Sequence, residues 1–199
     1  HILLPHDYLN LFLTGETVTE PGDASGTGYF DVRRRMWLPS VLKLIDSSFD
    51  LYSCLPRLIE SHQPAGRVRS KVATKLGISP QTLVSSGGGD NMMGAIGSGN
   101  VSSGVMTVSL GTSGTLYSYQ TSPIDDPSGE ISCFCDSTGS WLPLACTMNV
   151  TTATESIRNS FLGCDFDDFD ATVNSIPAGS NGLLMLPYLE GERLPDIPE

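Results

Sequence analysis

Residues 82–91 read TLVSSGGGDN, a short run with β-branched and small residues that ends in three glycines, an acid and an amide. Glycine has no Cβ, so the turn Gly87–Gly89 can adopt positive φ and let another molecule approach its backbone. We predict a strand over Thr82–Ser86 and a helix over Met92–Ile96 that starts beside Asp90. Ligands of α/β sheets usually bind at such strand ends.

Asp90 is the group in this stretch that can do chemistry. A carboxylate at the start of a helix is stabilised in its charged form by the helix dipole, so it can accept a proton at neutral pH. Phosphoryl transfer asks little more of a base, because positioning dominates that reaction. From spacing alone, the alternative that Asp90 is only an N-cap after a glycine turn stays open.

A second candidate is Gly111-Thr112-Ser113-Gly114, between the strand-like segments Val105–Leu110 and Thr115–Tyr119. Glycines at both ends leave backbone N–H groups free to point into a concavity, and the two hydroxyls add donors. Such a hairpin can hold phosphate oxygens without a lysine. The chain has no Walker A motif. An ordinary four-residue hairpin is the alternative here.

The other periodic segments predict a mixed α/β protein in two portions, with a boundary in the Gly/Ser-rich stretch Gly97–Gly104. We expect helices with proline near the start or glycine at the end, further strands, a capping box at Thr152 and Glu155, and a buried strand over Leu183–Leu186. The expected helices follow Pro5, lie around Pro39 and cover Ser70–Leu76, and the expected strands are Ile131–Cys135 and Trp141–Cys146.

Composition excludes some classes of function. Asp and Glu outnumber Lys and Arg by 22 to 11, for a net charge of −11, which argues against sequence-independent nucleic-acid binding. Phosphates held by backbone N–H groups need few cations, so ATP stays open. The chain has no run of 18 apolar residues that could span a membrane. The five irregularly spaced cysteines predict reduced thiols and a cytoplasmic protein.

Two pairs of adjacent charged residues have interpretations other than catalysis. His6 next to Asp7 is expected to be a polar pair on the opening helix rather than a catalytic dyad. Glu192 and Arg193 follow Gly191, and either an ion pair beside a cleft or a solvated turn fits them. No motif for metal ligation or for serine or metallo-hydrolase chemistry occurs in the chain.

Several short words, taken in order, resemble the FGGY family of carbohydrate kinases. They are PHDYLN at 5–10, LTG at 13–15, DASGT at 23–27, ESHQPAG at 60–66, GGGDN at 87–91, SLGTSG at 109–114, LPY at 186–188 and GER at 191–193. Each word alone is weak, but their order and spacing match the family over nearly the whole chain. Within the family, the words are most similar to those of kinases that act on xylulose.

The resemblance implies the actin-like, ribonuclease-H-like ATPase fold, with two domains around a cleft, present here as a central fragment. Residues 1–101 would be the later part of domain I, on the sugar side, and 102–199 the early part of domain II, on the nucleotide side. By the same resemblance, Asp90 is the catalytic base, Asp90 and Asn91 bind the sugar, and the nucleotide phosphates contact Gly111, Thr112, Ser113 and Gly114.

The activity implied is transfer of the γ-phosphoryl group of Mg-ATP to a sugar, most closely D-xylulose. A family member acting on ribulose, gluconate or fuculose, or a non-catalytic sugar- or nucleotide-binding relative, is the alternative. ATP and Mg²⁺ are the expected cofactors, and a small sugar is the expected partner; a homodimer is compatible with the sequence. The chain begins with His1 and lacks the family's N-terminal phosphate motif and adenosine site. We therefore expect these residues alone to be inactive, with the metal ligands elsewhere.

Overall fold

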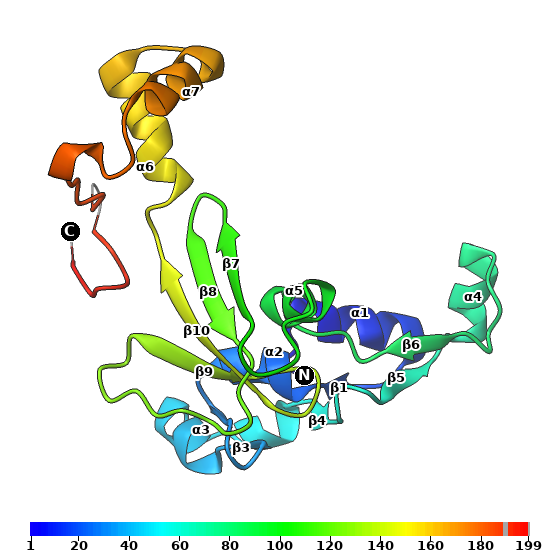
Figure 1. The fold of residues 1–199 in the computed structure, drawn as a ribbon. Coiled ribbons are helices and arrows are strands. Elements are labelled where there is room, and N and C mark those ends of the chain that lie inside the picture. Colours follow the sequence, from blue (N-terminus) through cyan, green and yellow to red (C-terminus); the bar gives the residue numbers. More distant parts are fainter. Residues whose placement is uncertain (189–190, 199) are drawn as a thin grey trace. The chain divides into compact units, whose positions relative to one another are not determined.

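The structure is a computed structural model that describes residues 1–188 and 191–198 (Figure 1). The chain forms two compact units. The first unit consists of His1–Thr107, Tyr117–Pro127 and Ser132–Leu144, and the second of Val108–Leu116, Ser128–Ile131 and Ala145–Glu199. Both contain helices and strands, so the prediction of a mixed α/β protein is confirmed.

Four of the five α-helices described in the first unit lie where the sequence predicts; the helix at Pro21–Ala24 was not predicted, and the one predicted over Met92–Ile96 starts at Asp90. The five are α1 (Pro5–Thr14), α2 (Pro21–Ala24), α3 (Pro39–Ile45), α4 (Ser70–Leu76) and α5 (Asp90–Gly97), with 3-10 turns at Ser25–Thr27 and Leu51–Cys54. Proline occupies the first turn of α1, α2 and α3, where its missing N–H costs nothing. Gly15 and Gly77 end α1 and α4 with φ of 89° and 68°, conformations that favour glycine.

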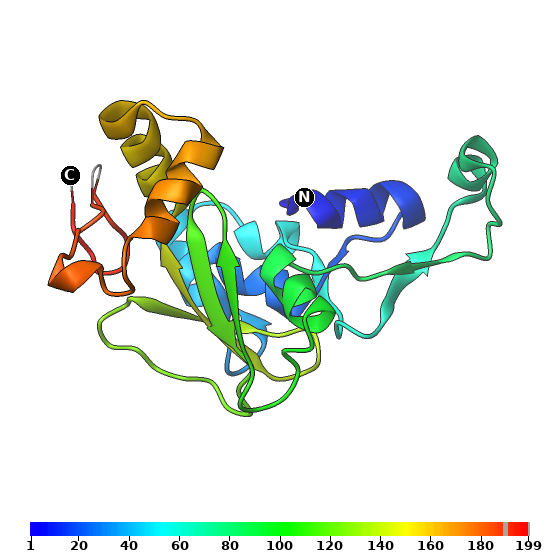
Figure 2. The same ribbon diagram turned by 45° about the horizontal axis from the view of Figure 1, so that its top comes forward.

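Three small strand pairs connect these helices. β1 (Val18–Thr19) runs parallel to β4 (Arg57–Leu58), β2 (Phe30–Asp31) is antiparallel to β3 (Met36–Trp37), and β5 (Pro64–Arg67) is antiparallel to β6 (Leu83–Ser85). β5 and β6 form an arm that carries α4 at its far end (Figures 1 and 2). The strand predicted over 82–86 is thus confirmed as β6, and it leads directly to Gly87.

The larger sheet has four strands in the order β7-β8-β10-β9. They are β7 (Met106–Leu110), β8 (Gly114–Ser118), β9 (Ile131–Cys135) and β10 (Trp141–Thr147), which confirms all four predicted strands. β7 and β8 are joined by the predicted hairpin at residues 111–113. Among the described residues, no helix is long and apolar enough to cross a bilayer.

The helices of the second unit are α6 (Thr151–Ser156), a π-helical continuation over Ile157–Leu162, α7 (Phe166–Ser175) and a 3-10 turn at Ser180–Gly182. The predicted capping box is wrong. Val150 is the N-cap of α6, and no side chain caps the helix. The Thr152 hydroxyl instead donates to the Thr112 carbonyl, while Glu155 pairs with Arg158. The side chains of the expected box already have other partners.

The buried strand predicted over Leu183–Leu186 is also wrong. These residues form no strand, and the side chains of Leu183 and Leu184 are 79% and 89% exposed. A strand also needs a neighbouring strand to pair with, and this segment has none among the described residues. The apolar composition of the run could not reveal that.

The first unit holds the best-formed core. Trp37 packs edge-on against Phe30 beside Ala24 and Cys135, and its indole N–H donates to the Pro56 carbonyl at 3.1 Å. Smaller clusters form around Val18, Ile59 and Ala65, and around Val68, Val72 and Ala73. In α5, Met92 and Ala95 are buried, while Asp90 is exposed. The helix therefore presents its first residue to solvent.

Candidate active site

The glycine turn (Gly87–Gly89) begins at a firmly anchored residue, Ser86. Its side chain is fully buried and its hydroxyl donates to the Ser61 carbonyl at 2.7 Å. The Ser86 carbonyl accepts a hydrogen bond from the side-chain amide of Asn10, on α1, at 2.6 Å. The chain thus enters the turn tied to two separate segments.

A Cβ at any position of the glycine turn would lie close to a neighbouring side chain. A Cβ on Gly87 would lie 2.7 Å from Cδ2 of His6, one on Gly88 2.7 Å from Cε of Met93, and one on Gly89 2.9 Å from Sδ of Met92. Positive φ, expected from the three glycines, occurs only at Gly87, where φ is 83°. At the other two positions the nearest atoms belong to the ends of the Met93 and Met92 side chains, which can shift, so Gly87 is the position that most requires glycine.

Asp90 follows as the first residue of α5 and is exposed, and its Oδ1 accepts a hydrogen bond from the Asn91 N–H at 2.7 Å. This is the positive end of the helix dipole, which stabilises a carboxylate. Tyr117 packs against the same helix. Its hydroxyl lies so near Gly94 that a Cβ there would be only 2.8 Å from it. Burial, and then the charge of Asp90, raise the pKa of Tyr117.

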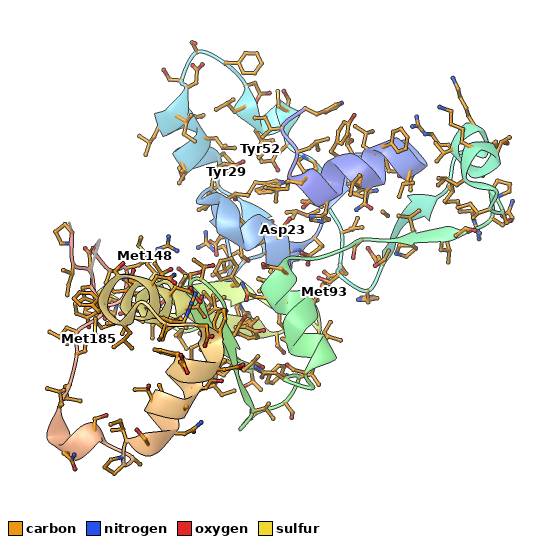
Figure 3. All side chains as sticks on the ribbon, turned by 90° about the horizontal axis from the view of Figure 1, so that it is seen from above. Asp23, Tyr29, Tyr52, Met93, Met148 and Met185 are labelled. Atoms are coloured by element: carbon orange, nitrogen blue, oxygen red, sulfur yellow. The ribbon has the colours of Figure 1, made fainter. Side chains whose placement is uncertain are left out.

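Polar groups around α2 complete this part of the site. Glu20 is fully buried, and its carboxylate accepts hydrogen bonds from the N–H groups of Gly22 at 2.8 Å and Asp23 at 2.6 Å and from the Ser61 hydroxyl at 2.6 Å. Figure 3 shows Asp23 and Met93 on the neighbouring helices α2 and α5. Sequence reasoning missed these groups, although the acid before Pro21 was a signal for an N-cap.

The hairpin at Gly111–Gly114 is held through its backbone. The Gly111 N–H donates to the Ser113 carbonyl at 3.0 Å, which closes the turn. The Gly111 carbonyl accepts from the Thr151 N–H at 3.1 Å, and the Thr112 carbonyl accepts from the Val150 N–H at 3.3 Å. The side chains of Thr112 and Ser113 are exposed. Two hydroxyl donors on a fixed backbone turn are suited to phosphate oxygens.

Gly114 must also be glycine for lack of space. A Cβ there would lie 2.7 Å from Cγ2 of Val150 and 3.1 Å from Cγ2 of Thr147. Beside Gly114 lies an apolar hollow of about 200 Å³, lined mainly by aliphatic side chains of the second unit. The hairpin is therefore tightly packed on the residues that precede and begin α6.

Glu192 secures that same segment. Its buried carboxylate accepts hydrogen bonds from the Thr147 hydroxyl at 2.6 Å, the Met148 N–H at 2.5 Å and the side-chain amide of Asn149 at 3.0 Å. Burial opposes the negative charge, but these donors and the Arg193 N–H outweigh it and lower the pKa of Glu192 to about 2. Glu192 is thus a charged anchor.

Neither interpretation of Glu192 and Arg193 from the sequence is right. Within the described residues, the Arg193 guanidinium donates to Sγ of Cys146 at 3.3 Å, so the two side chains do not pair. Glu192 is 4% exposed, which excludes a solvated turn for its side chain.

Residues 1–188 and 191–198 contain no group of three or more His, Cys, Asp or Glu side chains that could hold a metal ion. A hollow of about 540 Å³ formed by α3 and the residues after it includes none of the predicted site residues. The five cysteines are all free thiols.

The predicted site residues fall into two sets. Asp90 and Asn91 lie together at the start of α5 in the first unit, and Gly111, Thr112, Ser113 and Gly114 lie together in the second. In the second set, the Gly111 N–H that was expected to be free for a ligand instead donates to the Ser113 carbonyl. The roles predicted for both sets stay predictions.

Comparison with known proteins identifies related chains. The model of the FGGY family of carbohydrate kinases, N-terminal domain, matches residues 1–97. The chain is 45% identical over 197 residues to a xylulose kinase of Haemophilus influenzae, covering 99% of this chain and 40% of that protein. It is 39% identical to a xylulose kinase of Streptomyces rubiginosus, covering 99% of this chain and 38% of that protein.

Solved structures of carbohydrate kinases also match the chain. A xylulose kinase from Brucella ovis matches with a TM-score of 0.86 and 29% identity, over 98% of this chain and 39% of that one. A gluconate kinase from Lactobacillus acidophilus matches with a TM-score of 0.85 and 27% identity, over 94% of this chain and 38% of that one. The chain thus spans about 40% of the length of the relatives it matches. The prediction of an actin-like ATPase fold is confirmed. The chain corresponds to one part of that fold in the longer kinases that it matches. The chain belongs to the FGGY family of carbohydrate kinases and, within it, is similar to the xylulose kinases.

Proposed function

We propose that the protein containing this chain is a kinase that transfers the γ-phosphoryl group of ATP to D-xylulose, forming D-xylulose 5-phosphate. The observation that carries the proposal is the exposed carboxylate of Asp90, at the start of α5 and directly after the glycine turn. The similarity to xylulose kinases over nearly the whole chain supports the choice of sugar.

In the proposed reaction, the Asp90 carboxylate accepts the proton of the sugar hydroxyl that attacks. The sugar oxygen forms a bond to the γ-phosphorus in line with the bond that breaks, and ADP leaves with the electron pair of that bond. Asp90 then releases its proton to solvent. Asn91, next along α5, contributes to sugar binding. Because the transition state is loose, the base mainly has to be well placed.

The hairpin is the proposed contact for the nucleotide phosphates, through the backbone and hydroxyls of Thr112 and Ser113 and the flanking Gly111 and Gly114. The exposed hydroxyls and the fixed turn fit an anionic group. We propose that 1–101 forms the later part of the sugar-side domain and 102–199 the early part of the nucleotide-side domain. The match of the family's N-terminal domain to residues 1–97 supports that boundary.

ATP and Mg²⁺ are the proposed cofactors of the whole protein. The described residues of this chain do not form a metal site, so we assign no step to the ion. The free thiols are compatible with a reducing, cytoplasmic location. The small sugar and ATP are the proposed partners, and we propose no nucleic acid or membrane partner. The 199 residues alone are expected to be inactive.

Gluconate is the second candidate substrate. The structure of a gluconate kinase resembles the chain almost as well as that of a xylulose kinase, with TM-scores of 0.85 and 0.86. Ribulose and fuculose are further alternatives within the family. A non-catalytic relative is disfavoured, because both Asp90 and the hairpin glycines are present.

The substrate is tested with the full-length protein, ATP and a panel of D-xylulose, ribulose, fuculose and gluconate, by following ADP release. We expect the highest kcat/KM with D-xylulose. A preference for gluconate would overturn the choice of sugar but keep the kinase, whereas no sugar-dependent ADP release would overturn the proposed function.

Replacing Asp90 with Asn tests the base. We expect Asp90→Asn to lower kcat by about 10²- to 10⁴-fold, the usual contribution of general base catalysis, while the Kd for the sugar changes little. The matched control is Asp165→Asn, at another exposed aspartate that begins a helix, and it should keep wild-type kcat. A near-normal kcat in Asp90→Asn would mean that a different group is the base.

Replacing Glu192 with Gln tests the anchor of the hairpin. We expect a higher KM for ATP and an unchanged KM for the sugar, because the carboxylate holds the segment that supports the hairpin. The exposed Glu130→Gln is the control and should leave both constants unchanged. Equal effects on both KM values would argue for general destabilisation instead.

The same variant carries a pH signature. Because the pKa of Glu192 falls from 4.5 to about 2 on folding, its charge stabilises the fold above about pH 4.5, and this stabilisation is lost as the pH falls toward about 2. The stability advantage of wild type over Glu192→Gln, measured by urea unfolding, should therefore shrink across that range. An advantage independent of pH would contradict the account.

A further inference from the structure

The imidazole of His6 lies between two carboxylates beside the glycine turn. Its Nδ1 is 2.5 Å from Oδ2 of Asp23, and its Nε2 is 3.2 Å from Oδ1 of Asp7. The Asp7 side chain is 1% exposed, and those of His6 and Asp23 are 20% and 29% exposed. The cluster is therefore largely shielded from water. Charges interact more strongly in such surroundings than they do in water.

The acids around His6 favour its charged form. A hydrogen bond to Asp23 raises the pKa of His6; burial opposes this, and the charges of Asp7, Asp23 and Glu20 raise it further. These acids face the ring from α1, from α2 and from the residue before α2. Burial also raises the pKa of Asp7, against the effect of the nearby imidazolium. The carboxylates around the ring therefore favour its protonated form.

The same ring packs directly on the glycine turn. A Cβ on Gly87 would lie 2.7 Å from Cδ2 of His6, and one on Gly89 would lie 3.5 Å from Oδ1 of Asp23. Asp23 is itself fixed, because its N–H donates to the buried carboxylate of Glu20 at 2.6 Å. His6 therefore lies against the first glycine of the turn, and Asp23 lies near the last one.

Packing alone does not explain the cluster. Within the described residues, Nε2 of His6 and Oδ1 of Asp7 are buried without a well-oriented hydrogen bond. A neutral, apolar side chain could fill the same space without that cost. The contact between these two atoms is favourable chiefly as an attraction between opposite charges.

We propose that His6 is a positioning residue for phosphoryl transfer: its positively charged ring, held by Asp7 and Asp23, braces Gly87–Gly89 and so fixes the direction of the Asp90 carboxylate. The inference rests on the proposed function for its kinetic consequence only. The brace itself is a property of the first unit and can be measured without any substrate.

The brace predicts a pH dependence. A raised folded-state pKa means that the imidazolium is present below that pKa and is lost as the pH rises through it. The turn is therefore braced below that pKa and loosened as the pH rises through it. We expect kcat of the full-length enzyme to decline on the alkaline side as His6 loses its proton.

The kinetic test compares three variants of the full-length protein. His6→Gln removes the charge and should lower kcat by about 10- to 100-fold at neutral pH, the scale of a misplaced catalytic group. His6→Lys keeps a cation that deprotonates at higher pH, so it should retain more activity and shift the alkaline decline upward. His62→Gln, at the exposed loop histidine, is the control and should match wild type. Wild-type kcat and an unshifted profile in both His6 variants would overturn the proposal.

A second measurement separates this inference from the proposed function. Hydrogen exchange of the amides at residues 87–91 should be faster in His6→Gln than in wild type or His62→Gln, and faster in wild type above the pKa of His6 after correction for the intrinsic effect of pH. If no sugar is phosphorylated but exchange responds in this way, the brace stands and the proposed function fails. If exchange is the same in all three proteins, the brace is wrong whatever the activity. If His6→Gln does not fold, the pH dependence of exchange in wild type decides the question.

Discussion

The constraint on which the site depends lies at Gly87, where φ is 83° and the His6 ring occupies the place of a side chain. His6, Met93 and Met92 occupy the places where the side chains of the glycine turn would be. A side chain at Gly87 would meet the His6 ring and strain the backbone, so glycine at this position lets the chain turn into α5. Because Met92 is buried on one side of that helix, Asp90 at its first position is left exposed.

Two carboxylates in this chain have opposite surroundings, and these predict opposite roles. Asp90 is exposed at a helix N-terminus with a hydrogen bond from its own neighbour, Asn91, which is compatible with its proposed role as the base. Glu192 is buried and bound by donors from Thr147, Met148 and Asn149, which hold its pKa at about 2. With so low a pKa, the Glu192 carboxylate binds a proton too weakly to be an effective base at neutral pH. Its part is to hold the residues on which the Gly111–Gly114 hairpin rests.

Much of the local structure followed from the sequence because proline and glycine act on their immediate neighbours. Pro5 and Pro39 begin helices, Gly15 and Gly77 end them, and the strand before Gly87 lies where its β-branched and small residues predict. The candidate residues of the site were likewise visible in their motifs. What the pattern could not supply was the partner of each group across the fold.

The failures share that cause. The capping box at Thr152 did not form because α6 begins one residue earlier, at Thr151, and the Thr152 hydroxyl donates to the Thr112 carbonyl, 40 residues earlier. The brace beside Asp90 joins His6 to a turn some eighty residues later, and nothing in a local pattern indicates that contact. Leu183–Leu186 has the composition of a buried strand but lies exposed, since burial depends on a neighbour and not on the segment itself.

The most direct test of the central claim compares two glycines with similar backbones and different surroundings. Gly87 and Gly28 have φ of 83° and 79°, but a Cβ at Gly28 would meet nothing within 4 Å. Alanine should strain both backbones by about 1–2 kcal/mol, while only Gly87→Ala collides with His6. We predict that kcat of the full-length enzyme falls by about 100-fold in Gly87→Ala and stays close to wild type in Gly28→Ala. Equal kcat values for the two variants would contradict the account.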